Sequence, residues 1–319
     1  MPVITPACQT IPLNAIIFNN GWSLHPWDSL AISEALLQSF HRIGILHRPI
    51  LLAQEGDFFD VLCGFKRLSF AKLFAQTERM ECLVFSQDTD PTILLETLLT
   101  DQCLSQPLSL VEKARFIEIC TRFLSHRDIV SMYLEKLQLR KDVSALTELK
   151  VILQQDPLVI TEIHAGRLQE RIVSELLRLP DNSDRTALVQ LFKDLAMGNS
   201  KQKRFMTLIC DLAYRNSSAI STYLKIPAIA DILNDPVINI PQKIQHLGTY
   251  LQHELCPAYS QAEENFRQQV RTWQLPSVCS ISHSPGFEKD DVTLSITFRN
   301  IAECARLIAK INNILESNS

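Results

Sequence analysis

Glycine is scarce in this chain: it accounts for 8 of 319 residues, or roughly 2.5%, whereas about 7% is usual. Phosphate-binding loops of the G-x-G-x-x-G and Walker types need closely spaced glycines, and neither pattern occurs. No apolar run approaches the roughly 18 residues that cross a bilayer, and the first residues lack the basic stretch of a secretory signal. We therefore expect a cytoplasmic protein with no membrane partner and no glycine-rich phosphate loop.

Cysteine and histidine are present without the spacing of a metal site. The nine cysteines include no C-x-x-C pair, and the eight histidines form no H-E-x-x-H motif. An odd number of scattered cysteines is typical of buried free thiols in a reducing compartment. We therefore expect no metal, and we expect the histidines to be ordinary surface or core residues.

Positive charge is concentrated in the middle of the chain. Residues 108–215 carry 17 basic and 14 acidic side chains, whereas residues 1–107 carry 6 and 11, and residues 216–319 carry 8 and 10. The total charge of −4 is far from that of a dedicated nucleic-acid-binding domain. The middle segment is compatible with phosphate contact but does not require it.

Hydrophobic periodicity predicts an α+β protein in three parts. Residues 1–107 alternate strands (10–18, 49–53, 58–63, 81–85) with helices (29–43, 64–74, 92–100). Residues 108–255 show helical periodicity throughout, beginning at the capping box Ser109–Glu112. Residues 256–319 predict an α-β-β-α unit, with a helix beginning at a second capping box, Ser260–Glu263, a hairpin of strands 277–283 and 291–298, and a last helix over 300–315. This last unit is too small to be stable alone, so we expect it to dimerise or to pack on the helices.

The first part contains an ordered series of short motifs. They are Ile-Pro-Leu at 11–13, Gly-Ile-Leu at 44–46, Pro-Ile-Leu-Leu at 49–52, Gly-Phe-Lys-Arg at 64–67 with Ala-Lys-Leu at 71–73, and Leu-Ser at 108–109 with Glu-Lys-Ala at 112–114. In this order they resemble the ParB/sulfiredoxin fold, and ParB partition proteins in particular, over about residues 10–120. The segment His-Ala-Gly-Arg-Leu at 164–168 extends the resemblance more weakly.

The resemblance implies a phosphate site at the turn around Gly64. A strand that ends in glycine lets a ligand or another backbone come close, and the following helix offers free N–H groups to an anion. Lys66 and Arg67 stand in the first turn of that helix, where cations oppose the helix dipole unless an anion lies nearby. In the family this anion is the triphosphate of CTP, held with Mg²⁺, or the DNA backbone.

Two departures from the family pattern predict that CTP hydrolysis is absent and CTP binding is lost or weak. The acidic residue linked to hydrolysis in the family is Phe65 here, and a phenyl ring cannot accept a proton. The second nucleotide motif falls on residues 101–105, where Gln102 replaces the Mg²⁺-binding asparagine and Ser105 replaces an arginine. Residues 1–10 contain no basic side chain, so we do not expect coupling to a ParA-type ATPase. The sulfiredoxin cysteine position is also Phe65, and the adjacent Cys63 is expected to be buried.

The resemblance places a degenerate helix-turn-helix at 125–153. Residues 125–137 would be the supporting helix and residues 142–153 the recognition helix. The side chains expected to contact DNA are Arg140, Lys141, Ser144, Thr147 and Lys150, because arginine and lysine bind phosphate or guanine and hydroxyls bind either. Glu148 opposes this on the same helix, and the connection lacks the usual turn glycine. A second basic cluster, Lys201–Arg204, begins another helix.

Three hypotheses follow. The first is a ParB-like DNA-binding protein related to partition, not an enzyme, that dimerises through residues 256–319. The second is a protein-interaction scaffold on the same fold, which the net negative charge favours. The third is a nucleotide-dependent phosphotransferase, which would need a carboxylate near Gly64, such as Asp60, Glu96 or Asp101.

Overall fold

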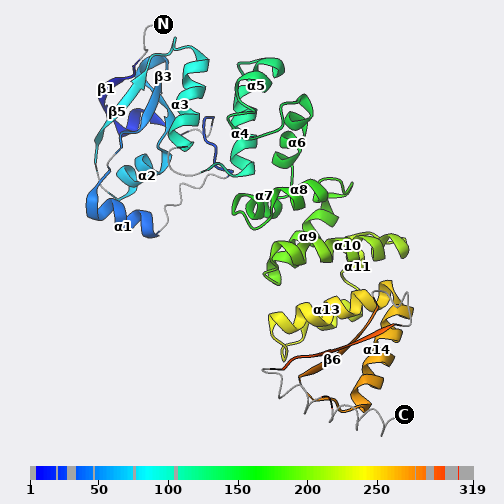
Figure 1. The fold of residues 1–319 in the computed structure, drawn as a ribbon. Coiled ribbons are helices and arrows are strands. Elements are labelled where there is room, and N and C mark those ends of the chain that lie inside the picture. Colours follow the sequence, from blue (N-terminus) through cyan, green and yellow to red (C-terminus); the bar gives the residue numbers. More distant parts are fainter. Residues whose placement is uncertain are drawn as a thin grey trace. The chain divides into compact units, whose positions relative to one another are not determined.

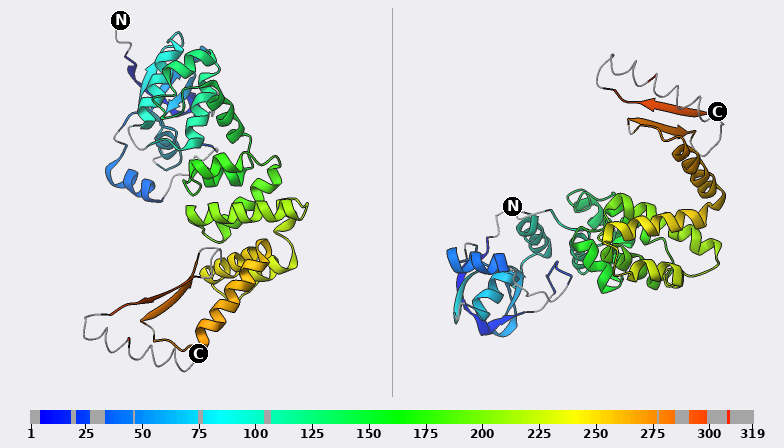
Figure 2. Two further views of the ribbon diagram at one scale, coloured as in Figure 1. Left: turned by 45° about the vertical axis from the view of Figure 1, so that its right-hand side comes forward. Right: turned by 90° about the horizontal axis from the view of Figure 1, so that it is seen from below.

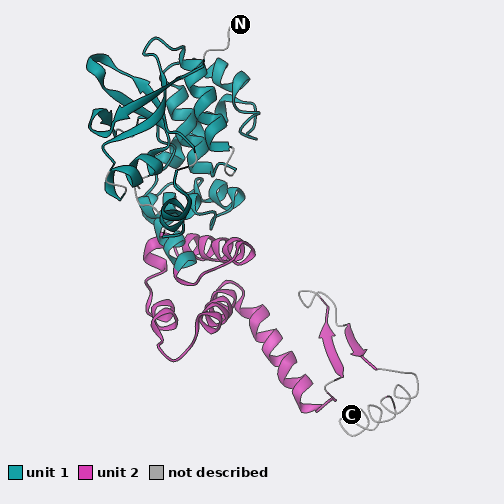
Figure 3. Cartoon of the chain, turned by 90° about the vertical axis from the view of Figure 1, so that its left-hand side faces the viewer, with its two compact units in different colours: residues 1–193 teal, residues 194–319 magenta. Residues whose placement is uncertain are grey.

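The computed structural model describes residues 5–18, 21–26, 34–45, 47–74, 77–103, 107–276, 278–284, 291–298 and 308. The chain divides into two compact units, Met1–Lys193 and Asp194–Ser319 (Figure 3). This division lies within the region 108–255 that was predicted as one helical domain. The predicted α+β class is confirmed, because one sheet and a long series of helices lie in the first unit and a hairpin lies in the second.

A five-stranded sheet begins the first unit (Figure 1). Its strands lie in the order β1-β5-β3-β4-β2, with bounds β1 (Ala7–Pro12), β2 (Ile16–Ile17), β3 (Ile50–Ala53), β4 (Phe59–Cys63) and β5 (Arg79–Phe85). β1 is antiparallel to β5 and β3 to β4, whereas β3 with β5 and β2 with β4 are parallel. The single strand predicted over 10–18 is wrong, because a 3-10 turn, η1 (Leu13–Ala15), separates β1 from β2 and buries Leu13.

Three helices accompany this sheet: α1 (Glu34–Ile43), α2 (Phe65–Leu73) and α3 (Pro91–Cys103), with a short 3-10 turn, η2 (Glu55–Asp57), before β4. The core of the lobe is formed by apolar side chains of the central strands, of which Leu51 and Val61 are fully buried. Leu68 and Ala71 of α2 pack into the same core. The start of α2 is thereby fixed next to the end of β4.

The rest of the first unit is helical. Its elements are α4 (Leu110–Cys120), α5 (His126–Met132), α6 (Val143–Leu153), α7 (Pro157–His164), α8 (Glu170–Leu176) and α9 (Asn182–Asp194). The capping box predicted at Ser109 is confirmed: Glu112 N donates to Ser109 Oγ at 3.2 Å, and Ser109 N donates to Glu112 Oε2 at 2.8 Å. The helix predicted to extend to residue 137 ends at Met132, where turns carry the chain past the fully buried Tyr133.

The second unit contains α10 (Asn199–Arg215), α11 (Ile220–Tyr223), α12 (Pro227–Asn234), α13 (Ile240–Leu255) and α14 (Pro257–Thr272), then β6 (Cys279–His283) and β7 (Val292–Ile296). The hairpin is confirmed as antiparallel, with Cys279 opposite Ile296 (Figure 2). The capping box at Ser260 is wrong. Pro257 starts α14 one turn earlier because its fixed φ suits the first helical position. α12 was not predicted, and the predicted helix over 300–315 lies almost entirely outside the described residues.

The cysteines follow the prediction only in part. Cys63, Cys82 and Cys120 are free and buried, as expected. Cys8, Cys103 and Cys256 are exposed, so the expectation of buried thiols is wrong for them. In the described part of the chain, no helix is both long enough and apolar enough to span a bilayer.

Candidate nucleic-acid interface

The backbone approach predicted at Gly64 is made by the protein itself. Gly64 has a φ of 93°, in the left-handed region, where it begins α2. A Cβ atom at this position would lie 3.1 Å from Cα of Pro49. Glycine is therefore required here by the chain turn and by the residue that precedes β3.

Arg67 is bound to protein acceptors. Its Nη1 donates to the carbonyls of His47 at 3.2 Å and Arg48 at 3.1 Å, and its Nη2 donates to Asp101 Oδ2 at 3.3 Å. The side chains of Arg67 and Asp101 are 19% and 23% exposed. The guanidinium therefore joins the start of α2 to the chain before β3 and to the end of α3, and an anion would have to displace these contacts.

The two residues before Arg67, Phe65 and Lys66, have different surroundings. Phe65 is half-buried and packs against the apolar core of the lobe. Lys66 is half-exposed, and its charge contributes to lowering the pKa of His164. Of the two cations predicted to meet phosphate, only Lys66 makes no hydrogen bond or ion pair with the described residues.

The residues expected to hold CTP with Mg²⁺ are only partly described. Arg67 and Asp101, beside the turn, form an ion pair with each other, which a triphosphate would have to displace. Gln102 stands where the resemblance leads us to expect an asparagine, and its side chain is one methylene longer. Ser105 lies outside the described residues.

The carboxylates named for a phosphotransferase serve separate structural contacts. Asp60 Oδ2 accepts from Gln54 Nε2 at 3.1 Å, and Glu96 forms an ion pair with Lys136 at 2.5 Å. Asp101 is bound to Arg67. Each of these three carboxylates thus already has a partner among the described residues.

Cys63 is unsuited to redox chemistry. Its side chain has no exposed surface, and burial raises the pKa of the thiol well above its usual value. The neighbouring Asp101 raises the pKa further. A reactive thiol needs access and a lowered pKa, and Cys63 has neither.

The second predicted interface consists of α5 and α6. Ten residues, 133–142, connect them, whereas the turn of a helix-turn-helix usually has three or four. Gln138 takes a φ of 57° in this connection, the conformation for which a turn glycine is normally selected. Asp142 then caps α6 by accepting a hydrogen bond from Ala145 N at 2.9 Å. One face of α6 is buried, which leaves the other to solvent.

All five residues predicted to contact DNA are exposed: Arg140, Lys141, Ser144, Thr147 and Lys150. Three have close local partners. Arg140 pairs with Glu148 at 2.6 Å, Lys141 pairs with Glu135 at 2.7 Å, and Ser144 Oγ donates to Asp142 at 2.5 Å. Within the described parts of the chain, Lys150 has no ion pair. Exposed ion pairs contribute only about 0–1 kcal/mol, so phosphate groups can replace them.

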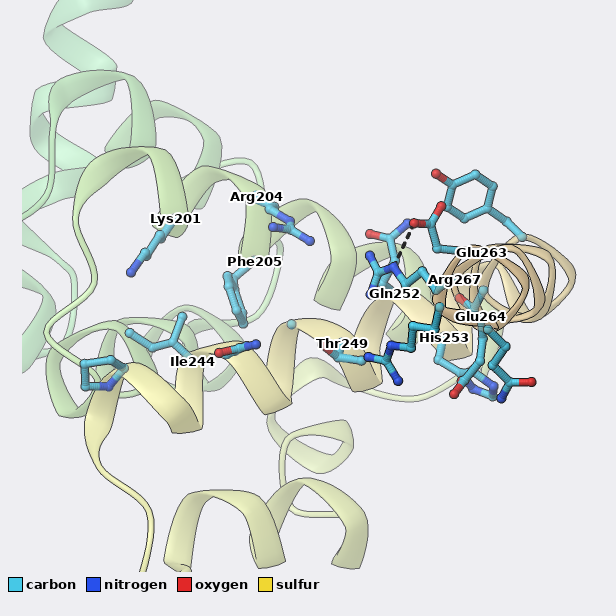
Figure 4. A pocket seen from close by; sticks show the side chains of 17 residues that line it. Lys201, Arg204, Phe205, Ile244, Thr249, Gln252, His253, Glu263, Glu264 and Arg267 are labelled. Atoms are coloured by element: carbon cyan, nitrogen blue, oxygen red, sulfur yellow. Dashed lines mark hydrogen bonds and ion pairs between the residues drawn. The ribbon is translucent and has the colours of Figure 1, made fainter. Parts of the chain in front are cut away.

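The basic cluster Lys201–Arg204 lies on a cleft within the second unit (Figure 4). The cleft has a volume of about 780 Å³ and is lined by α10, α13 and α14. Phe205 and Gly248 are among its lining residues, and a Cβ on Gly248 would be 3.3 Å from Cζ of Phe205. On the α14 side Arg267 donates to Glu263 at 3.0 Å. The cleft carries cations and carboxylates together, so its charge favours no single ligand.

A partly buried cluster that the sequence did not predict lies at the first turn of α4. It contains His25, Glu112 and His164, which are separated by 87 and 52 positions in the chain. His25 Nδ1 lies 3.5 Å from Glu112 Oε1, and His164 Nδ1 lies 2.9 Å from Ser109 Oγ. In the sequence Glu112 was recognised as a helix-capping residue and His164 as part of the segment 164–168, but nothing indicated a site, because the three residues are adjacent only in the folded chain.

The protonation states in this cluster are shifted by burial and by neighbouring groups. Burial would by itself raise the pKa of Glu112, but hydrogen bonds from His25 and Ser109 outweigh it and lower that pKa. Burial lowers the pKa of His164, the charge of Glu112 opposes this, and smaller effects of His25 and Lys66 act in the same direction as burial. The cluster therefore combines a charged carboxylate with a neutral imidazole near pH 7.

Comparison with known proteins identifies no family for the chain: no protein-family model matches it, and no curated protein matches it. Among solved structures, it is similar to the C-terminally truncated chromosome-partitioning protein ParB from Caulobacter crescentus in two complexes. With the centromeric parS site, the identity is 12%, the TM-score is 0.35, and the match covers 62% of this chain and 97% of that chain. With CTP-gamma-S, the identity is 14% and the TM-score is 0.26, and the match covers 58% of this chain and 98% of that chain. Both TM-scores are too low for either match to assign a function.

Proposed function

We propose that this protein binds DNA through the exposed face of α6 and the connection that precedes it, in a role related to partition. The observation that carries the proposal is the exposure of Lys150 on α6, whose opposite face is buried, together with the exposure of Arg140 and Lys141 in the connection just before this helix. A helix fixed on a packed scaffold can be laid against a duplex without an ordering cost for its backbone.

The turn at Gly64 has a structural part in this proposal. Arg67 is held by Asp101 and by two backbone carbonyls, so it supports the fold of the lobe. Lys66 is the remaining cation at that turn and is available for a phosphate contact. The protein would thus act as a binding protein and not as an enzyme.

We also propose that the described part of residues 256–319 takes part in self-association. A two-stranded sheet is at best marginally stable in water without a further covering layer. β7 leaves Val292 and Leu294 56% and 38% exposed. A second copy of the hairpin offers a complementary apolar surface, and a dimer would bring two copies of α6 to one duplex.

DNA binding is tested by titrating a mixed-sequence duplex with the protein at several salt concentrations. Each phosphate contact should contribute about −0.9 to the slope of log K against log salt. Lys150→Ala should weaken binding and reduce the steepness of the slope by about one. Lys225→Ala, at an exposed lysine of the second unit, is the matched control and should change neither quantity.

A duplex affinity that does not change with salt concentration, or the absence of binding at low salt, would overturn the DNA proposal. The protein-interaction scaffold would then be the better explanation, since Arg140 and Lys141 already have acidic neighbours. Thermal unfolding followed by circular dichroism verifies that each variant is folded before its affinity is compared.

A further inference from the structure

The cluster of His25, Glu112 and His164 brings together side chains from three separate segments of the first unit. His25 lies in the segment after β2, Glu112 in the first turn of α4, and His164 at the end of α7. One nitrogen or oxygen atom from each lies within 4.8 Å of the corresponding atoms of the other two. Two imidazoles and a carboxylate are the donor set of several three-residue zinc sites.

The spacing is close to that of a bound metal ion. Zinc ligands lie about 2.0–2.1 Å from the ion, so two ligand atoms in a tetrahedral site lie roughly 3.3 Å apart. His25 Nδ1 and Glu112 Oε1 are already 3.5 Å apart. The distances from His164 to the other two ligand atoms are at most 4.8 Å. To reach roughly 3.3 Å they need to shorten by at most about 1.5 Å, which rotation of an imidazole ring can supply.

The carboxylate is held in place by the fold. Glu112 is 3% exposed, and its Oε2 accepts the hydrogen bond of the capping box from Ser109 N. This leaves Oε1 on the side of His25. A buried carboxylate needs a partner that compensates its charge, and a metal ion provides one more fully than a neutral imidazole does.

His164 also has the surroundings of a metal ligand. Its Nδ1 lies 2.9 Å from Ser109 Oγ, so Nε2 is the nitrogen that would bind the ion. Metal-bound histidines commonly have their other nitrogen hydrogen-bonded in this way, which fixes the ring and its tautomer. Ser109 therefore contacts both Glu112 and His164, and it orients two of the three side chains.

We propose that His25, Glu112 and His164 form a site for one divalent transition-metal ion, most readily Zn²⁺, with a fourth position open to water or an anion. The bound ion would join the segment after β2 to α4 and α7 and would stabilise the first unit.

The site is tested with the full-length chain, freed of metal by a chelator and kept reduced. Titration calorimetry with ZnCl₂ should give one saturable site, and Co²⁺ should give visible absorption bands on binding. Glu112→Gln is the most informative variant, because glutamine retains the capping box while it removes the charged ligand. It should weaken Zn²⁺ binding at least 100-fold, as should His25→Ala.

Two variants serve as controls. His126→Ala removes an exposed histidine, and Cys103→Ser removes an exposed thiol at the end of α3; both should leave the affinity unchanged. In the unaltered protein, Zn²⁺ at 100 times its Kd should raise the melting temperature by about 5 °C or more, and Glu112→Gln should remove this rise. If no saturable site appears, or if Glu112→Gln binds like the His126→Ala control, the cluster is a hydrogen-bonded structural element and the proposal fails.

Discussion

At the scale of single residues, two glycines share a left-handed backbone conformation but differ in the space available for a side chain. Gly64 and Gly166 have φ values of 93° and 70°. A Cβ would meet the backbone of Pro49 at Gly64, whereas nothing lies within 4 Å of one at Gly166. The two positions therefore separate backbone strain from steric crowding.

We expect Gly166→Ala to lower the free energy of unfolding by about 1–2 kcal/mol, the cost of a left-handed residue with a side chain. Gly64→Ala should cost about 1–3 kcal/mol more, because the added methyl group also overpacks the junction with Pro49. Urea unfolding followed by circular dichroism measures both. Equal losses in the two variants would show that the junction relaxes around the methyl group.

At the scale of elements, an ion pair joins the described part of the hairpin to α14. His283 Nε2, on β6, lies 2.6 Å from Glu263 Oε2, and the imidazole packs edge-on against Phe266. The carbonyl of Ser284 and then Glu263 raise the pKa of His283, although partial burial and the nearby Arg267 oppose them. The hydrogen bond with His283 lowers the pKa of Glu263.

This pair should stabilise the attachment of the hairpin over a limited pH range. A raised histidine pKa contributes stability below the unfolded value of about 6.5, and the contribution is lost as the pH rises through the folded pKa. A lowered glutamate pKa contributes above about 4.5 and is lost as the pH falls through its folded value. Histidine ring signals in NMR should show His283 titrating above 6.5, and Glu263→Gln should lower that pKa. An unchanged titration in the variant would contradict the pairing.

The elements also show which local signals were reliable. The Ser109 capping box formed as predicted because both of its partners lie within one turn. The Ser260–Glu263 pattern did not form a cap, because Pro257 and Cys256 allow α14 to begin earlier. Periodicity located most helices and strands, but it missed α12 and the interruption between β1 and β2, where packing of Leu13 decides the turn.

At the scale of the whole molecule, the proposed self-association can be tested at β7. Val292→Asp with Leu294→Asp would place two charges on the exposed strand and should convert a dimer into a monomer in sedimentation velocity. Duplex affinity should fall at least tenfold, because linking two binding sites commonly raises affinity by about 10²–10⁴. Val237→Asp, at an 87% exposed position of the same unit, is the control. A monomeric unaltered protein would contradict the proposal directly.

The sequence by itself determined the α+β class, the positions of most elements and the exposure of the five side chains on and before α6, because these depend on periodicity and on contacts within a turn. It also placed Gly64, Phe65 and Cys63 correctly with respect to the end of β4. Only the tertiary structure decided that Arg67 is held by Asp101 and that His25, Glu112 and His164 meet. Those contacts join residues 34 to 139 positions apart, and the folding of the backbone, not local spacing, sets the distance between them.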